Sequence, residues 1–178
     1  SEALAVLEKG LEKSKPNARL FNTLGLIHLD RTRYDAATRR FRQAIAAAEN
    51  DTGILATAWN NLGLTAEKSG QTEAARQYYA RALRVSPDYN MARRNLSRLL
   101  LDNGQPDRAI PLLRQLIEKK PGDSVAANLL ATALTADGQL LEAIAVLEKT
   151  TDQSPAAAIT YYNLACLYAR QGNDQMAL

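Results

Sequence analysis

Residues 59–87, WNNLGLTAEKSGQTEAARQYYARALRVSP, decide the fold. Up to Gly70, the apolar and small residues are spaced as one face of an amphipathic helix. A glycine at position 70 can adopt the left-handed conformation that ends a helix, and a second helix is predicted over residues 73–85. Pro87 stops that helix, because proline has no amide hydrogen to donate and disfavours helix in the preceding residue. The stretch therefore predicts a hairpin of two helices.

The same hairpin recurs along the chain with a period of 34 residues. Glycines mark the turn inside each copy, and leucines, alanines and prolines repeat in step with them. The matching residues are Leu62, Leu96, Leu130 and Leu164; Gly70, Gly104, Gly138 and Gly172; Ala75, Ala109, Ala143 and Ala177; and Pro87, Pro121 and Pro155. An earlier copy is offset by four more residues, which we place near residues 49–53, and it has Thr32 at the glycine position. The repetition predicts a stack of hairpins, each burying its apolar face against the next.

These residues resemble the tetratricopeptide repeat. The resemblance is carried by Trp59, Leu62, Gly63, Ala66, Ala75, Tyr79, Ala82 and Pro87. It implies an all-α fold, an α-α superhelix (solenoid) of stacked antiparallel helix hairpins with about five repeats plus partial ends. We expect one repeat domain over residues 1–178, made of a partial repeat 1–17, repeats 18–55, 56–89, 90–123 and 124–157, and a truncated repeat 158–178. Neither end supplies a polar cap, so we expect a fragment of a longer protein.

The composition, with 46% hydrophobic and 23% charged residues, is typical of a soluble protein. The net charge of +3 is small and does not require a nucleic-acid partner. No stretch of about 18 apolar residues occurs, so we expect no membrane insertion. A single cysteine excludes an internal disulfide and leaves the compartment open between cytoplasm and periplasm. The abundance of alanine and arginine favours a bacterial source.

Residues that could perform chemistry are sparse. His28 is the only histidine and lies in an inward-facing column of a first helix, so we expect a packed side chain. Cys166 also lies within a predicted helix, and no second histidine is present to activate it as a nucleophile. The sequence shows no cluster of metal ligands and no glycine-rich phosphate loop. We therefore expect no catalytic residues, no metal and no cofactor, and the chain is not expected to be an enzyme.

The family resemblance implies that the first helices line a concave groove. The column just before the repeated leucine holds Asn61, Asn95 and Asn163. In several members of the family, asparagines in this column hold an extended peptide, because a side-chain amide can both donate to and accept from a backbone unit. The alternative is that these asparagines bond neighbouring helices or water.

Neighbouring columns extend the predicted partner-binding surface with Asn60, Arg94, Arg98, Asn128 and Tyr162. Arg94 and Arg98 are one helical turn apart and share a face. With Lys68 from the preceding copy they would form a cationic spot suited to a carboxylate or phosphate. The alternative is a solvated arginine pair balanced by Asp102.

The expected function is a protein–protein interaction scaffold that binds a peptide or helical segment of a partner in its groove. One alternative is a regulatory or targeting arm of a larger enzyme or of a secretion or assembly complex. Another is a scaffold that self-associates through exposed solenoid ends. The basic run over residues 31–42 is interpreted as the solvated outer face of a helix, because it lacks interleaved aromatic residues for base stacking, so no nucleic acid is expected.

Overall fold

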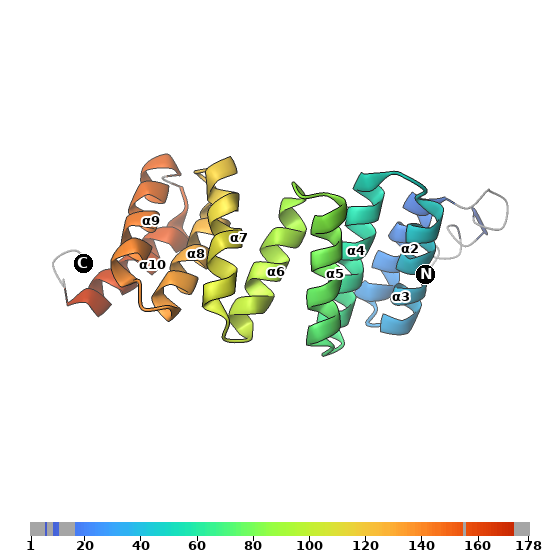
Figure 1. Cartoon of the computed structure of the whole chain (residues 1–178), viewed down its shortest axis with the longest axis horizontal. Coiled ribbons are helices and arrows are strands. Elements are labelled where there is room, and N and C mark those ends of the chain that lie inside the picture. Colours follow the sequence, from blue (N-terminus) through green and yellow to red (C-terminus); the bar gives the residue numbers. More distant parts are fainter. Residues whose placement is uncertain (1–5, 7–8, 11–16, 155, 173–178) are drawn as a thin grey trace. The chain divides into compact units, whose positions relative to one another are not determined.

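The computed structural model describes residues 6, 9–10, 17–154 and 156–172, and every regular element in them is an α-helix. Helices α2 to α10 follow one another through short turns (Figure 1). The fold is an all-α helical repeat of the solenoid class, as the sequence predicts. Most of the predicted partial repeat 1–17, the end of the truncated repeat at 173–178, and Pro155 lie outside the described residues. The chain forms two compact units, residues 1–92 and 93–178, and each is described by itself.

The first unit contains two helical hairpins. Its helices are α2 (Ala18–Asp30), α3 (Tyr34–Ala47), α4 (Thr52–Lys68) and α5 (Thr72–Val85). Within each hairpin the two helices pack together, and α4 also contacts both α2 and α3 of the preceding hairpin. Asn17 and Asp51 cap the N-termini of α2 and α4, each accepting a hydrogen bond from a backbone amide three residues later.

The second unit continues the pattern. Helix α6 (Asn90–Asp102) begins three residues before the boundary between the units, and it is followed by α7 (Pro106–Lys119), α8 (Ser124–Ala136), α9 (Leu140–Gln153) and α10 (Ala158–Gln171). Helix α8 packs against α7 and α9, and α10 contacts α9 and α8. Asp123 caps α8, because its Oδ1 accepts a hydrogen bond of 3.1 Å from the amide of Ala126.

The predicted four-residue insertion lengthens a helix. Helix α4 has 17 residues, whereas the first helices α2, α6 and α8 each have 13. Four residues add about one turn, since an α-helix has about 3.6 residues per turn. The insertion therefore extends the N-terminal end of α4 and keeps the repeat register at its other end.

The glycines at the hairpin turns adopt the left-handed conformation that the sequence predicts. Their φ angles are 79° at Gly70, 67° at Gly104, 81° at Gly138 and 80° at Gly172. Thr32 occupies the same turn of the earlier copy and has a φ of 56°. A β-branched residue in this region is strained, because its Cβ crowds the backbone, so the turn between α2 and α3 carries strain that the four glycine turns do not.

Glycines inside the first helices allow an aromatic ring to approach closely. A Cβ atom on Gly63 would lie 2.5 Å from Cδ1 of Tyr79, and one on Gly25 would lie 2.4 Å from Cε1 of Phe41. Both rings are fully buried. Because packed interiors cannot absorb such overlaps, each of these two hairpins requires a residue without a side chain at this position.

The second unit solves the same packing problem with different sizes. Ala131 and Leu147 occupy the repeat positions of Gly63 and Tyr79, and both are buried. The larger residue on the first helix thus accompanies the smaller residue on the second helix. The summed side-chain size at this contact is therefore similar in the two hairpins, although both residues differ.

Candidate partner-binding surface

In the first unit, the asparagines of the predicted groove form a hydrogen-bonded cluster between α2 and α4. Asn61 donates from Nδ2 to Oδ1 of Asn22 at 2.9 Å, and its own oxygen accepts from Nδ2 of Asn60 at 3.4 Å. Asn61 is 7% exposed and Asn60 is 1% exposed. Asn61 therefore bonds the neighbouring helix and Asn60 bonds Asn61, and direct contact between either of them and a partner stays a prediction.

The second unit repeats this bond at the same repeat positions. Asn163 of α10 donates from Nδ2 to Oδ1 of Asn128 on α8 at 2.9 Å. Asn128 in turn donates to Oγ1 of Thr160 at 3.0 Å. Asn128 and Asn163 are half-buried, so part of each amide faces solvent. The second-unit pair thus links two hairpins and remains accessible to a partner.

The three asparagines of the predicted column, Asn61, Asn95 and Asn163, do not all belong to one unit. Asn95 is half-buried on α6 of the second unit, whereas Asn61 belongs to the first. Tyr162, from the neighbouring column, lies on α10 with 70% of its surface exposed. A continuous ladder through Asn61, Asn95 and Asn163 stays a prediction.

The two arginines of α6 are paired with carboxylates. Arg98 lies 3.3 Å from Asp102, as the alternative interpretation proposed. Arg94 instead forms an ion pair of 2.6 Å with Asp123, the residue that caps α8. Asp123 is 29 residues away in the sequence, which is why local spacing does not reveal it. Both guanidinium groups are therefore partly neutralised, which weakens their attraction for an anionic partner.

Lys68, the third member of the predicted cationic spot, lies in the first unit at the end of α4. Its side chain is exposed and has no ion-pair partner in the described part of the chain. It lines a pocket with Leu26, Leu29, Asp30, Thr32 and Tyr34. A spot shared by Lys68, Arg94 and Arg98 stays a prediction.

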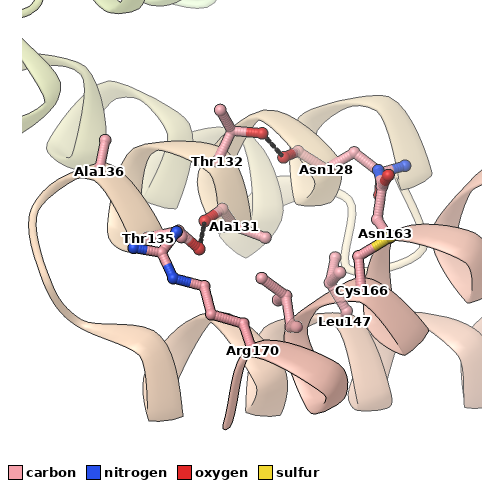
Figure 2. Close-up of a pocket in the computed structure, with 10 residues that line it drawn as sticks. Asn128, Ala131, Thr132, Thr135, Ala136, Leu147, Asn163, Cys166 and Arg170 are labelled. Atoms are coloured by element: carbon pink, nitrogen blue, oxygen red, sulfur yellow. Dashed lines mark hydrogen bonds between the residues drawn. The ribbon is translucent and has the colours of Figure 1, made fainter. Parts of the chain in front are cut away.

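A pocket of about 350 Å³ lies between α8 and α10 of the second unit. Its described lining comprises Asn128, Ala131, Thr132, Thr135, Ala136, Leu147, Asn163, Cys166, Leu167 and Arg170. Figure 2 shows the two asparagines at one end and Arg170 reaching from α10 across the pocket toward α8. We call this the α8–α10 pocket. Leu147 of α9 and Leu167 of α10 give the pocket part of its apolar lining.

Arg170 and Cys166 are pocket residues that sequence reasoning did not select. Cys166 is exposed, although a small packed filler was expected. Arg170 stands at the repeat position of Lys68, 102 residues later. Because Lys68 was selected as a cation of the groove, the repeat register could also have pointed to Arg170. None of the described lining residues is a carboxylate or a histidine, so the pocket offers hydrogen bonding and one positive charge without a general base.

Two ionisable groups outside the pocket have shifted pKa values. The hydroxyl of Tyr168 donates a hydrogen bond to Glu148 of α9, and this bond raises the pKa of Tyr168 because it stabilises the protonated phenol. On α5, the hydrogen bond and charge of Glu73 raise the pKa of Arg76. The first interaction connects α10 to α9, whereas the second is an exposed pair within α5.

No three histidine, cysteine or acidic side chains of the described residues come together in a way that could ligate a metal ion. No described helix has both the length and the apolar character needed to cross a bilayer.

The sequence matches known repeats over nearly its whole length. Tetratricopeptide repeat profiles match residues 17–88 and, in three overlapping segments, residues 60–124, 94–158 and 128–178. The uncharacterized protein ycf37 of Cyanophora paradoxa is 31% identical over 93 residues, which are 52% of this chain and 54% of that protein. Its counterpart in Guillardia theta is 33% identical over 95 residues, 52% of this chain and 53% of that protein. The chain thus spans about half the length of these curated relatives.

Solved structures share the fold. YrrB, described as a TPR protein with an unusual peptide-binding site, superposes with a TM-score of 0.75 and 23% identity, covering 97% of this chain and 87% of YrrB. MamA of Desulfovibrio magneticus RS-1 gives a TM-score of 0.75 and 24% identity, covering 90% of this chain and 88% of the MamA chain. At these identities the likeness establishes the arrangement of helices.

Proposed function

The chain belongs to the tetratricopeptide repeat family, a family of protein-interaction scaffolds, and we propose that it binds a peptide or helical segment of a partner protein on the face formed by its first helices. In the second unit this face centres on the α8–α10 pocket. The proposed role is non-catalytic, since the pocket has groups for recognition and none arranged for acid–base or nucleophilic chemistry.

The observation that carries the proposal is a group of exposed apolar side chains beside the pocket. Ile159 is 69% exposed and Tyr162 is 70% exposed. They precede Asn163 and Cys166 by one helical turn, so they share the pocket's face of α10. Val125 of α8 is also exposed and lies one turn before Asn128. Large apolar side chains that are exposed together next to a pocket are characteristic of an interaction surface.

The asparagine pair can link the hairpins and still bind a partner. Each side-chain amide offers two donor hydrogens and an oxygen with two lone pairs. The bond between Asn163 and Asn128 uses one donor of the first and one acceptor of the second. Asn163 therefore retains an oxygen and a second amide hydrogen, a combination that suits a peptide backbone unit. The peptide-binding site attributed to YrrB supports this proposal by analogy of fold.

A peptide-selection experiment tests the proposal. Random linear peptides displayed on phage are selected on the immobilised protein, and the affinity of the best synthetic peptide is measured by fluorescence anisotropy. We expect the double variant Ile159→Ser/Tyr162→Ala to bind at least about tenfold more weakly, because it removes apolar area buried by the peptide.

Leu141 supplies a matched control for this experiment. It lies on α9, a second helix, and is 69% exposed, the same fraction as Ile159. Leu141→Ser should leave the affinity unchanged. Failure to select any peptide, or an equal loss of affinity in Leu141→Ser, would show that the first-helix face is not the binding surface.

A further inference from the structure

The α8–α10 pocket ends in a positive charge that no carboxylate of the described residues balances. Arg170 is exposed and takes part in no hydrogen bond or ion pair with the described chain. The other arginines on first helices of the second unit that face the predicted groove, Arg94 and Arg98, are each paired with an aspartate. Arg170 is therefore the guanidinium on this face best placed to receive a negative charge from a ligand.

The separation between the asparagine pair and Arg170 sets the length of peptide that could contact both. Asn163 and Arg170 are seven residues apart on one helix, which corresponds to about 10 Å at about 1.5 Å per residue. An extended peptide advances about 3.3 Å per residue, so about three residues cover this distance. The asparagine pair can bond the backbone at one end, and the apolar surface of Ala131, Leu147 and Leu167 can receive a side chain. The guanidinium is then within reach of a neighbouring acidic residue.

The first unit contains a second pocket that shares four repeat positions with the α8–α10 pocket. This α2–α4 pocket has a volume of about 420 Å³, and Leu26 and Leu29 stand where the α8–α10 pocket has Thr132 and Thr135. Lys68 stands where the other pocket has Arg170. The apolar lining with one cation at the same end is thus present in both units, although the individual residues differ.

The two pockets are not equal in charge. Asp30 lines the α2–α4 pocket, at the repeat position of Ala136, and its carboxylate opposes the binding of another anion. Lys68 also lacks the planar, forked donor geometry with which an arginine holds a carboxylate. The second-unit pocket is therefore the stronger anion-binding site of the two.

We infer that the partner segment carries an apolar side chain with an acidic residue beside it, the apolar group entering the α8–α10 pocket and the carboxylate pairing with Arg170. The α2–α4 pocket, with Lys68, takes the same kind of motif more weakly. This inference rests on the proposed function and adds to it the chemistry of the partner. A protein segment is favoured over a nucleic acid because each pocket has one cation and an apolar floor, whereas a phosphate backbone is bound by successive cations.

Charge reversal tests the inference in the same peptide-display format. The intact chain, Arg170→Glu, Lys68→Glu and Lys149→Glu are used for parallel selections. Lys149 is exposed on α9, a second helix, and so controls for the change in net charge. The chain and Lys149→Glu should enrich peptides in which Leu, Ile, Met or Phe adjoins Asp or Glu. Arg170→Glu should lose these peptides and enrich Lys or Arg next to the apolar residue.

Affinities of one selected acidic peptide give the quantitative result. Arg170→Glu should weaken its binding about tenfold or more, the size expected for a charge-assisted hydrogen bond, and Lys68→Glu should weaken it less. Circular dichroism and thermal melting check each fold, and Arg170→Gln replaces Arg170→Glu if the latter melts early. Selected peptides without acidic residues, or acidic peptides that bind Arg170→Glu equally well, would overturn the inference and leave the proposed function standing.

Two other outcomes are equally decisive. If the chain selects no peptide at all, the proposed function fails and the inference fails with it. A labelled single-stranded oligonucleotide serves as the second probe. Binding of this oligonucleotide that is lost in Arg170→Glu and kept in Lys149→Glu would assign the cation to nucleic acid and overturn the acidic-peptide inference.

Discussion

The side-chain amide of Asn163 lies 2.9 Å from the side-chain oxygen of Asn128, one hairpin earlier in the chain. Asn61 makes the equivalent contact with Asn22 at the same distance in the first unit. The bond therefore recurs as part of the repeat and joins successive hairpins. A substitution at one of these asparagines changes stability as well as partner binding, and the two effects have to be measured separately.

Asn163→Ala should lower the free energy of unfolding by about 1 kcal/mol, because the partly buried oxygen of Asn128 loses its donor. The measurement is urea denaturation followed by circular dichroism. A double-mutant cycle with Asn128→Ala should show that the two losses are less than additive. Tyr162→Ala, on the exposed side of the same helix, should leave the unfolding free energy nearly unchanged. Equal effects of Asn163→Ala and Tyr162→Ala would mean that the bond contributes nothing.

Gly63→Ala should destabilise the first unit by about 1–3 kcal/mol, although alanine normally stabilises a helix relative to glycine. The added Cβ would lie 2.5 Å from the ring of Tyr79, which is fully buried. The double variant Gly63→Ala/Tyr79→Leu recreates the residue sizes of Ala131 and Leu147. It should be more stable than the sum of the single changes predicts. Additive losses in thermal denaturation would contradict this size matching.

Thr32→Gly should raise the melting temperature. The φ of 56° at Thr32 costs a β-branched residue about 1–2 kcal/mol, while glycine adopts it freely. The greater chain entropy of glycine in the unfolded state offsets about 0.5–1 kcal/mol of this gain. The reciprocal change, Gly70→Thr, places the strain in the next turn and should lower the melting temperature. If both substitutions shift it in the same direction, backbone strain is not the cause.

Asp123 combines two roles that conservative substitutions can separate. Its Oδ1 caps α8 and its Oδ2 pairs with Arg94. Asp123→Asn keeps the capping oxygen and loses the charge, so we expect a loss below about 1 kcal/mol for this partly exposed pair. Asp123→Ala removes the cap too and should cost about 1–2 kcal/mol. Chemical denaturation distinguishes the two, and equal losses would show that the cap contributes little.

The repeat register predicted the fold well because it depends on residues that act locally. A glycine such as Gly104 can end a helix through its own left-handed backbone conformation, and the alternation of small and large side chains determines how two adjacent helices pack. The break in the register placed the four-residue insertion near residues 49–53, and the structure shows the extra turn at the start of α4, which begins at Thr52. The form of the insertion was not predictable, since either a longer loop or an extra turn of α4 would preserve the register.

The candidate site was less predictable because its properties depend on neighbours distant in the sequence. Arg94 was expected to be available to a ligand or balanced by Asp102, and its partner is Asp123 in the next hairpin. Asn61 could serve a peptide or a neighbouring helix, and only the position of Asn22 shows that it bonds the helix. Arg170 could have been identified by comparing equivalent positions of the repeats, because it stands at the repeat position of Lys68. The repeated packing residues alone do not point to it.

The size matching between Gly63 and Tyr79 and between Ala131 and Leu147 also restricts how such a gene can change. A recombination event that joined the first helix of one copy to the second helix of the other would place alanine against tyrosine, or glycine against leucine, producing a clash or a void. Crossovers between complete hairpins keep each matched pair together. We therefore expect hairpins of this chain to tolerate duplication, deletion or exchange as whole units, and a breakpoint inside a hairpin to destabilise the product.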